Sequence, residues 1–170
     1  SPMYRGLVGV NNLNRELQNR LNPNQEGLKL GSRELRINDK VMQVRNNYNK
    51  EIFNGDIGSV KDIDKKIYRI VVDFDGKDVL IEREEINEIV LAYAISVHKS
   101  QGNEYQGVVI PLLTQHFIML QRNLFYTALT RAKRLSCVVG SYKALHIAIK
   151  NDKPVKRNSR LRTKLEALNL

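Results

Sequence analysis

Two continuous apolar runs, separated by a helical pattern, limit the folds open to residues 91–150. Residues 107–112 and 135–139 are apolar at successive positions, which is typical of parallel strands buried on both faces. Residues from about 118 to 133 have helical spacing, and Gly140-Ser141 precedes a second short helix. Its inward residues are expected to be Tyr142, Leu145 and Ile149. Strand, helix, strand, helix in this order predicts a right-handed parallel α/β layer.

Residues 1–30 predict a further piece of the same layer. Four apolar residues recur at three- and four-residue spacing: Val10, Leu13, Leu17 and Leu21. This spacing predicts an amphipathic helix, preceded by a glycine-containing turn and ended by Asn22-Pro23. Such a helix typically follows a strand in α/β proteins. Because the chain does not begin with Met, we expect further residues upstream in its parent protein.

Residues 31–90 have a different pattern, with short strands separated by turns about every ten residues. Strand-like runs occupy residues 41–44, 57–60, 67–72 and 79–81. This pattern predicts a small β-barrel of SH3-like size, inserted between the two parts of the α/β domain, residues 1–30 and 91–150. Asp73 and Asp75 resemble a metal-binding carboxylate pair, but Gly76 directly after Asp75 favours a hairpin turn instead.

The net charge of +10 is unevenly distributed along the chain. Residues 31–90 hold 11 Lys and Arg against 13 Asp and Glu, so the basic excess lies mainly in residues 91–149 and in a basic tail, residues 151–170. An anionic polymer that contacts residues 91–170 fits this distribution, although many proteins are basic for solubility alone.

The single cysteine and the lengths of the apolar runs place the chain among cytoplasmic proteins. Cys137 lies in an apolar run and is expected to be a small buried side chain. One cysteine also disfavours a disulfide-stapled secreted module. Because no apolar stretch approaches the roughly 18 residues of a membrane span, we expect a cytoplasmic location and no membrane partner.

The stretch LAYAISVHKSQGNEY, residues 91–105, changes from apolar to polar at Ser96 and then supplies many kinds of functional group. A strand that ends there would place Ser96 and Lys99 at the sheet edge where α/β proteins bind ligands. Gly102 allows close approach of the backbone to a phosphate, and Glu104 is able to accept a hydrogen bond from a ribose hydroxyl. The simpler alternative is a set of ordinary loop residues.

A second stretch, LFYTALTRAKR, ends in three basic residues at the end of the predicted helix: Arg131, Lys133 and Arg134. Cations near a helix C-terminus are favoured by the helix dipole, which is the simplest explanation for them. Three basic residues in four positions exceed this need. A guanidinium directed outward between a helix and a strand is also able to act as an arginine finger on a transferring γ-phosphoryl group.

These two stretches resemble motifs V and VI of superfamily 1 DNA helicases. SVHKSQGNEY resembles motif V and LFYTALTRAKR resembles motif VI. With the N-terminal SPMYRG and the Leu-Asn, Leu-Gln and Leu-Asn-Pro positions after it, they resemble the RecD/TraA branch of 5′-to-3′ helicases, related to the exonuclease V alpha subunit. The resemblance implies a RecA-like second motor domain interrupted by an SH3-like β-barrel insertion. It also implies ATP with Mg²⁺ as cofactor and single-stranded DNA as partner.

The resemblance assigns roles to individual residues. Arg131 resembles the arginine that contacts the γ-phosphate from across an interdomain cleft. The nucleotide-binding residues that it implies are Arg5, Gln101, Gly102, Glu104 and Thr130. The DNA-binding residues that it implies are Ser96, His98, Lys99, Tyr126 and Thr127. Tyr126, Thr127 and Thr130 are further expected to couple the two ligands, and no residue is expected to bind a metal.

The sequence lacks the phosphate-binding loop G-x-x-x-x-G-K-[ST]. The only Gly-Lys pair, Gly76-Lys77, is followed by Asp78 in the predicted hairpin. We therefore expect ATP and Mg²⁺ to be held mainly by an N-terminal RecA-like domain of the parent protein. By itself the chain is expected neither to hydrolyse ATP nor to unwind DNA, and ATPase activity abolished by Arg131→Ala would contradict this. Other subunits of a helicase–nuclease complex are further candidate partners.

Two other functions remain open at this point. The first is a non-catalytic nucleic-acid-binding module built on the SH3-like barrel, which predicts contacts in residues 31–90. The second is a protein-interaction scaffold that docks through the basic tail. A charge-reversal scan distinguishes them from the motor, since the motor predicts loss of DNA binding from changes in residues 96–105 and 122–134.

Overall fold

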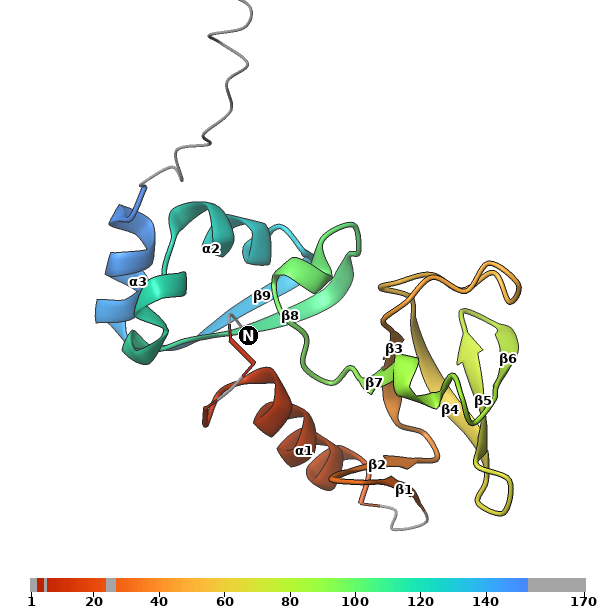
Figure 1. Cartoon of the computed structure of the whole chain (residues 1–170). Helices are drawn as coiled ribbons and strands as arrows, with labels where there is room; N and C mark the ends of the chain where they lie inside the picture. Colours follow the sequence, from red (N-terminus) through yellow and green to blue (C-terminus); the bar gives the residue numbers. More distant parts are fainter. Residues whose placement is uncertain (1–2, 5, 24–26, 153–170) are drawn as a thin grey trace, which may run out of the picture.

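The computed structural model describes residues 3–4, 6–23 and 27–152, and they form an α/β part and a β-barrel part (Figure 1). In the α/β part, strands β8 (Tyr105–Leu112) and β9 (Ala132–Gly140) pair in parallel. Helix α2 (Arg122–Leu129) connects them, and helix α3 (Tyr142–Lys150) follows β9. The predicted order of strand, helix, strand, helix is confirmed, because the apolar runs and the helical spacing coincide with these elements.

Helices α2 and α3 pack with the 3-10 turn η3 (Thr114–Met119) against β8. Ile110 and Leu112 of β8 are buried there, together with Ala128 of α2. The helical run is shorter than residues 118–133, because Leu120 and Gln121 are not helical and Gln121 caps α2 from an extended conformation. Tertiary contacts set this start: Asn151 donates to the Leu120 carbonyl at 2.8 Å.

Several expectations about burial in the α/β part are wrong. Strand β8 was expected to be buried on both faces, yet Gly107 and Val109 are exposed, because β8 also has one strand neighbour, β9, among the described residues. Strand β9 was expected to be buried, yet residues 133–140 are exposed, Cys137 among them. The reason is that β9 has one strand neighbour, β8, among the described residues. In α3 the inward face carries Ala144 and Ala148 (both 0% exposed) rather than Tyr142 (92%) and Ile149 (48%).

The barrel is a five-stranded antiparallel sheet in the order β6-β5-β4-β3-β7. Its strands are β3 (Lys40–Gln43), β4 (Ile57–Asp64), β5 (Arg69–Phe74), β6 (Lys77–Ile81) and β7 (Ile89–Leu91). Alternate residues point into one core, which includes Val41, Val60, Ile70, Val72 and Ile81. The predicted barrel and its Asp75-Gly76 hairpin are both confirmed: Asp75 (φ 53°) and Gly76 (φ 89°) join β5 to β6, and Asp73 accepts the Gly76 N–H at 2.7 Å.

A two-stranded hairpin precedes the barrel and was not predicted. Strands β1 (Gly27–Leu30) and β2 (Arg33–Arg36) pair across Gly31 and Ser32, with Gly31 at φ 63°. Leu28 and Leu35 belong to the same buried cluster as the barrel strands. The sequence-based boundary between residues 30 and 31 therefore falls within this hairpin, and β7, which holds Leu91, pairs with β3 of the barrel.

Helix α1 (Val10–Leu21) is present as predicted, but its buried face is largely polar. Val10, Asn14 and Gln18 are buried, whereas Leu21 is 66% exposed and Leu13 and Leu17 are half-buried. Apolar spacing correctly located the helix and misplaced its inward face. In Figure 1, α1 lies on the side of β8 and β9 opposite to α2.

Candidate nucleotide-facing loops and nucleic-acid cleft

The segment between the barrel and β8 carries the first motif on loops and one 3-10 turn. Strand β7 ends at Leu91, and the turn η2 spans His98–Ser100. The sequence had indicated that Ser96 and Lys99 follow a strand of the parallel sheet. This expectation is wrong, because the strand before them, β7, belongs to the antiparallel barrel. Ser96 is instead fixed by packing: it is buried, and its hydroxyl lies 3.2 Å from the Tyr4 hydroxyl and accepts the Lys99 N–H at 3.3 Å.

Arg131 belongs to the second motif and hydrogen-bonds to the loop of the first. It lies directly after Thr130, the C-cap of α2, and is half-buried. Its guanidinium donates to the carbonyl of Asn103 at 3.2 Å, the carbonyl of Thr127 at 3.3 Å and the hydroxyl of Thr130 at 3.4 Å. Its own carbonyl accepts the N–H of Tyr105 at 2.8 Å. These guanidinium bonds are long, and three acceptors leave part of the five N–H groups of an arginine for a ligand.

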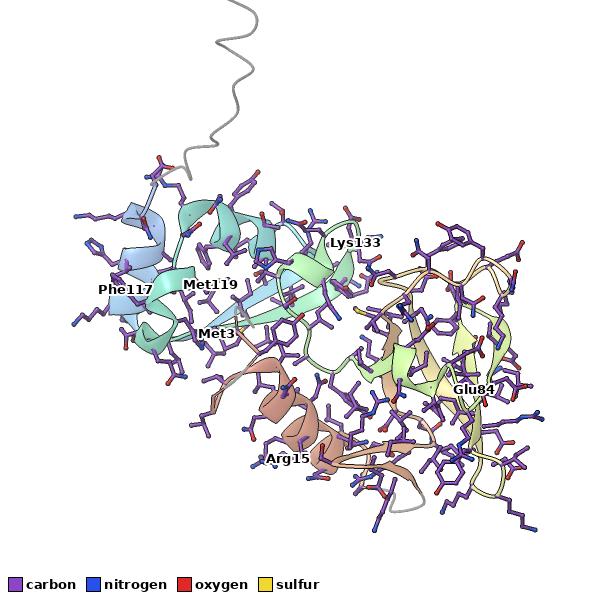
Figure 2. All side chains as sticks on the ribbon, viewed as in Figure 1. Met3, Arg15, Glu84, Phe117, Met119 and Lys133 are labelled. Carbon is purple, nitrogen blue, oxygen red and sulfur yellow. The ribbon has the colours of Figure 1, made fainter. Side chains whose placement is uncertain are left out.

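The loop beside Arg131 presents polar groups to solvent. Gln101, Gly102 and Glu104 are all exposed. Gly102 has φ 87°, and a Cβ at this position would meet no atom within 4 Å, so its backbone is open to a ligand. Glu104 forms an exposed ion pair with Lys133 at 3.4 Å. Figure 2 shows Lys133 at the end of the parallel sheet nearest the barrel.

A broad open cleft of about 1120 Å³ lies between α1, the β1–β2 hairpin and the segment that leads to η2. Its lining includes five cations and one carboxylate: Arg15, Lys29, Arg33, Arg36, Lys99 and Glu34. Ser96 and several side-chain amides of α1 also line it. A basic, amide-rich cleft of this kind suits an anionic chain that carries hydrogen-bonding groups.

A buried carboxylate, that of Asp39 (0% exposed), forms hydrogen bonds with the segments around this cleft. It accepts hydrogen bonds from Gln18 at 2.5 Å, Asn22 at 2.8 Å and the Tyr93 hydroxyl at 3.0 Å. The N–H of Arg36 also donates to it, at 2.7 Å. Burial, and next the Asp39 charge, raise the pKa of Tyr93 to about 12, so the phenol remains a donor. The network holds α1, the barrel and residue 93 in one arrangement.

Comparison with known proteins agrees with both parts of the fold. The family model described as "ATP-dependent RecD-like DNA helicase SH3 domain" matches residues 13–74, and the "UvrD-like helicase C-terminal domain" matches residues 91–139. The chain is 40% identical over 167 residues to the ATP-dependent RecD2 DNA helicase of Deinococcus radiodurans. The chain belongs to the RecD-like helicases.

The RecD-like chain spans about a quarter of the length of these relatives. The Deinococcus alignment covers 98% of the chain and 23% of the relative. The RecBCD enzyme subunit RecD of Haemophilus influenzae is 33% identical over 162 residues, which is 95% of the chain and 24% of that protein. A Bacteroides Pif1 helicase, solved with ADP-AlF3 and single-stranded DNA, superposes with TM-score 0.58 over 91% of the chain and 42% of the Pif1 chain, at 20% identity. This last likeness supports the fold.

The predicted site residues of the RecD-like chain fall into two groups. Gln101, Gly102, Glu104, Thr130 and Arg131 gather around the loop before β8 and the end of α2. Ser96 and Lys99 line the cleft, next to the exposed His98. Arg5 and most of the basic tail lie outside the described residues.

Tyr126 and Thr127 lie apart from the second group. Tyr126 is 67% exposed on α2, and neither residue is among those that line the cleft in the described part of the chain. The Thr127 carbonyl accepts from Arg131, so Thr127 lies with the first group.

The sequence analysis used Asn14, Gln18 and Asn22 only as marks of the family resemblance, and it assigned no role to the amide side chains that fix both groups. Asn14 bonds to both backbone groups of Ala94, with N···O distances of 2.8 and 2.9 Å. Asn103 bonds to the barrel, and Asn22 and Gln18 bond to Asp39. The spacing of Asn14, Gln18 and Asn22, four residues apart, was visible as a polar stripe on the predicted helix and was the signal available.

Two further findings concern metals and membranes. Within residues 3–4, 6–23 and 27–152, no three His, Cys, Asp or Glu side chains gather in a way that could hold a metal ion. No helix in this part of the chain has the length and apolar character needed to cross a bilayer.

Proposed function

We propose that the chain is the second motor region of an ATP-dependent 5′-to-3′ DNA helicase, in which Arg131 contacts the γ-phosphate of ATP. The carrying observation is the junction of Arg131 with the exposed loop 101–104, where one guanidinium, one open glycine and one carboxylate come together. Gln101, Gly102 and Thr130 would contact the nucleotide, and Glu104 its ribose. A guanidinium there stabilises the charge that spreads over a transferring phosphoryl group.

Single-stranded DNA is the proposed ligand of the cleft. Its phosphates would meet Lys99 and the cations of α1 and the hairpin, and Ser96 would donate to the same backbone. Residues 31–90 are net acidic as a whole, but Arg33 and Arg36 of the hairpin lie among them and line the cleft. The charge of the cleft therefore differs from the net charge of this segment. His98, Tyr126 and Thr127 are proposed as outer contacts of the strand. The short segment from Ser96 to Glu104 would then connect the two ligands.

The triphosphate fits the residues present better than Mg²⁺ does. A guanidinium with unused donors and an unobstructed glycine backbone suit phosphate oxygens. The described residues offer no cluster of carboxylates for the metal. We therefore assign Mg²⁺ and the β-phosphate to another RecA-like domain of the parent protein, and we propose that the chain alone has no ATPase activity. ATP supplies the free energy for movement along DNA.

The test is DNA-stimulated ATPase activity of the parent helicase. Arg131→Ala should lower kcat by about 10³-fold or more while ATP still binds. Arg131→Lys should restore little, because a lysine lacks the planar fork of donors. Arg134→Ala, three residues along on exposed β9, is the matched control and should retain full activity. Wild-type kcat in Arg131→Ala would overturn the proposal.

A further inference from the structure

The side chain of Asn103 connects the barrel to residues 96–105, the segment that carries the first motif. Its amide nitrogen donates to the Gly55 carbonyl at 3.1 Å, across 48 positions in the sequence. Gly55 lies in the turn before β4, and its own N–H donates to the Gln43 carbonyl of β3 at 2.9 Å. The acceptor is therefore fixed to the barrel sheet. Gly55 has φ 105°, a conformation that favours glycine, so the turn that presents this carbonyl depends on the residue there.

The main chain of the same asparagine touches Arg131. The Asn103 carbonyl accepts from the guanidinium at 3.2 Å, so one residue is bonded on one side to the barrel and on the other to Arg131. The Asn103 N–H donates to the Ser100 carbonyl at 3.2 Å, which fixes the peptide from the η2 side. Movement of the Asn103 side chain with the barrel would thus change the position of the carbonyl that holds the guanidinium.

Tyr105 makes a second, parallel connection between the same parts. Its N–H donates to the Arg131 carbonyl at 2.8 Å, and the ammonium of Lys40 in β3 lies 5.9 Å from the centre of its ring. The barrel, the loop and Arg131 are therefore joined through residues 103 and 105. Of the two, Asn103 makes the directional bond to the barrel and contacts the guanidinium itself.

We propose that Asn103 is a positioning residue that ties the Arg131 guanidinium to the barrel, so that the barrel's placement governs the reach of Arg131. This inference rests on the proposed role of Arg131 in ATP hydrolysis. The barrel then acts on catalysis without touching the nucleotide. Barrel displacement would release the Asn103 amide, and Arg131 would lose the carbonyl that orients it.

The experiment compares Asn103→Ala and Asn103→Asp in the parent helicase. Aspartate keeps the shape of the side chain and cannot donate to the Gly55 carbonyl. Both variants should lower kcat of DNA-stimulated ATP hydrolysis by about 10- to 100-fold, the scale of a small misplacement of a catalytic group. KM for ATP and affinity for single-stranded DNA should stay within about twofold of wild type, since ground-state contacts remain. The matched control is Asn49→Ala, at an exposed asparagine in the segment between β3 and β4 that also holds Gly55.

Amide hydrogen exchange provides a readout that does not depend on catalysis. Asn103→Ala should speed exchange both in residues 53–56 and in residues 101–105, and Asn49→Ala should leave residues 101–105 unchanged. Unchanged exchange in Asn103→Ala, or wild-type kcat in both Asn103 variants, would overturn the inference even where Arg131→Ala abolishes turnover. Full turnover in Arg131→Ala would instead refute the proposed function, and the exchange result would still decide whether the connection exists.

Discussion

Asp39 shows how a charged side chain is accommodated in an interior position. Its carboxylate is fully buried and accepts four hydrogen bonds, three from side chains and one from the Arg36 N–H. A buried charge is tolerated only where hydrogen bonds replace its hydration. These donors come from α1, from β2 and from residue 93, so the same bonds that satisfy the charge also fix three segments relative to one another.

Removal of the Asp39 carboxylate should destabilise the fold strongly. Asp39→Ala removes the acceptor of the Tyr93 hydroxyl and one of the two acceptors of each amide, that of Gln18 and that of Asn22. Each unsatisfied buried donor costs about 1–3 kcal/mol. We expect the free energy of unfolding to fall by about 3 kcal/mol or more, measured by urea denaturation followed by circular dichroism. Glu84→Ala, at an exposed position of the barrel (Figure 2), should change it by less than about 0.5 kcal/mol. Equal effects of the two changes would contradict the structural role of Asp39.

At the level of single residues, sequence patterns identified some polar residues of the candidate site but did not identify the polar residues that hold them in place. Ser96, Lys99 and Arg131 stood out because polar and basic residues follow apolar runs. Asp39 and Asn103 did not, because an isolated polar residue carries no spacing that marks it. Their importance comes from partners 21 and 48 positions away in the chain, which only the fold brings near.

Among the elements, the β5–β6 hairpin is the one whose conformation the sequence determines most directly. Asp75 and Gly76 both have positive φ, as a two-residue turn of this type requires. The Asp73 carboxylate caps the turn by accepting the Gly76 N–H. The Asp-Gly pair was therefore sufficient to predict this turn, and local chemistry alone explains it.

Gly76→Ala should destabilise the barrel for a purely conformational reason. A Cβ at Gly76 would meet no atom within 4 Å, so no clash adds to the cost of about 1 kcal/mol for a left-handed alanine. The matched control is Gly107→Ala in β8, where φ is not positive and the nearest atom would lie 3.8 Å away. Thermal unfolding should show a lower Tm for Gly76→Ala and little change for Gly107→Ala. A similar Tm for both variants would contradict this account.

The helices show where sequence patterns misled the interpretation. Apolar spacing placed α1 correctly but assigned its inward face to leucines, whereas Asn14 and Gln18 are buried because the fold gives their amides partners. In α3, small alanines face inward since they allow close packing against α2 and η3. The strand β9 has the composition of a buried strand, and its exposure reflects how few neighbours it has among the described residues. An apolar composition therefore indicates that a strand can be buried, but the elements packed around it determine whether it is buried.

At the scale of the whole molecule, the cleft forms only when segments that are far apart in the sequence come together in the fold. Residues of α1, the β1–β2 hairpin and the segment around Ser96 form its walls. The hairpin was not predicted, so the contribution of Lys29 and Arg33 to a basic surface could not be seen from regional charge. Arg33 and Arg36 are also committed to structural bonds, with the Ile89 carbonyl and Glu34 respectively. Arg15 bonds within its own helix, to Asn12 at 2.8 Å and to Glu16 at 3.9 Å, and these contacts are exposed. Arg15, Lys29 and Lys99 are therefore the cations that we expect to serve a ligand.

The proposed DNA-binding role of the cleft makes a quantitative prediction about salt. For single strands, the logarithm of the binding constant falls with the logarithm of salt concentration with a slope of about −0.7 per phosphate contact. Replacing Arg15, Lys29 and Lys99 with Gln in the parent helicase should make this slope less negative by about 2, and binding should weaken at every salt concentration. Fluorescence anisotropy of a labelled oligothymidylate at several salt concentrations measures both quantities.

The control for this measurement is a triple variant that removes the same number of positive charges from positions outside the cleft. Lys65, Lys66 and Lys143 are exposed and do not line the cleft, so their triple replacement with Gln removes the same charge from the barrel turn and α3. If binding depended only on net charge, the two triple variants would show the same slope. A cleft that holds the strand requires the slope to change in the first variant and to stay at the wild-type value in the second, because counterions are released only where phosphates are contacted.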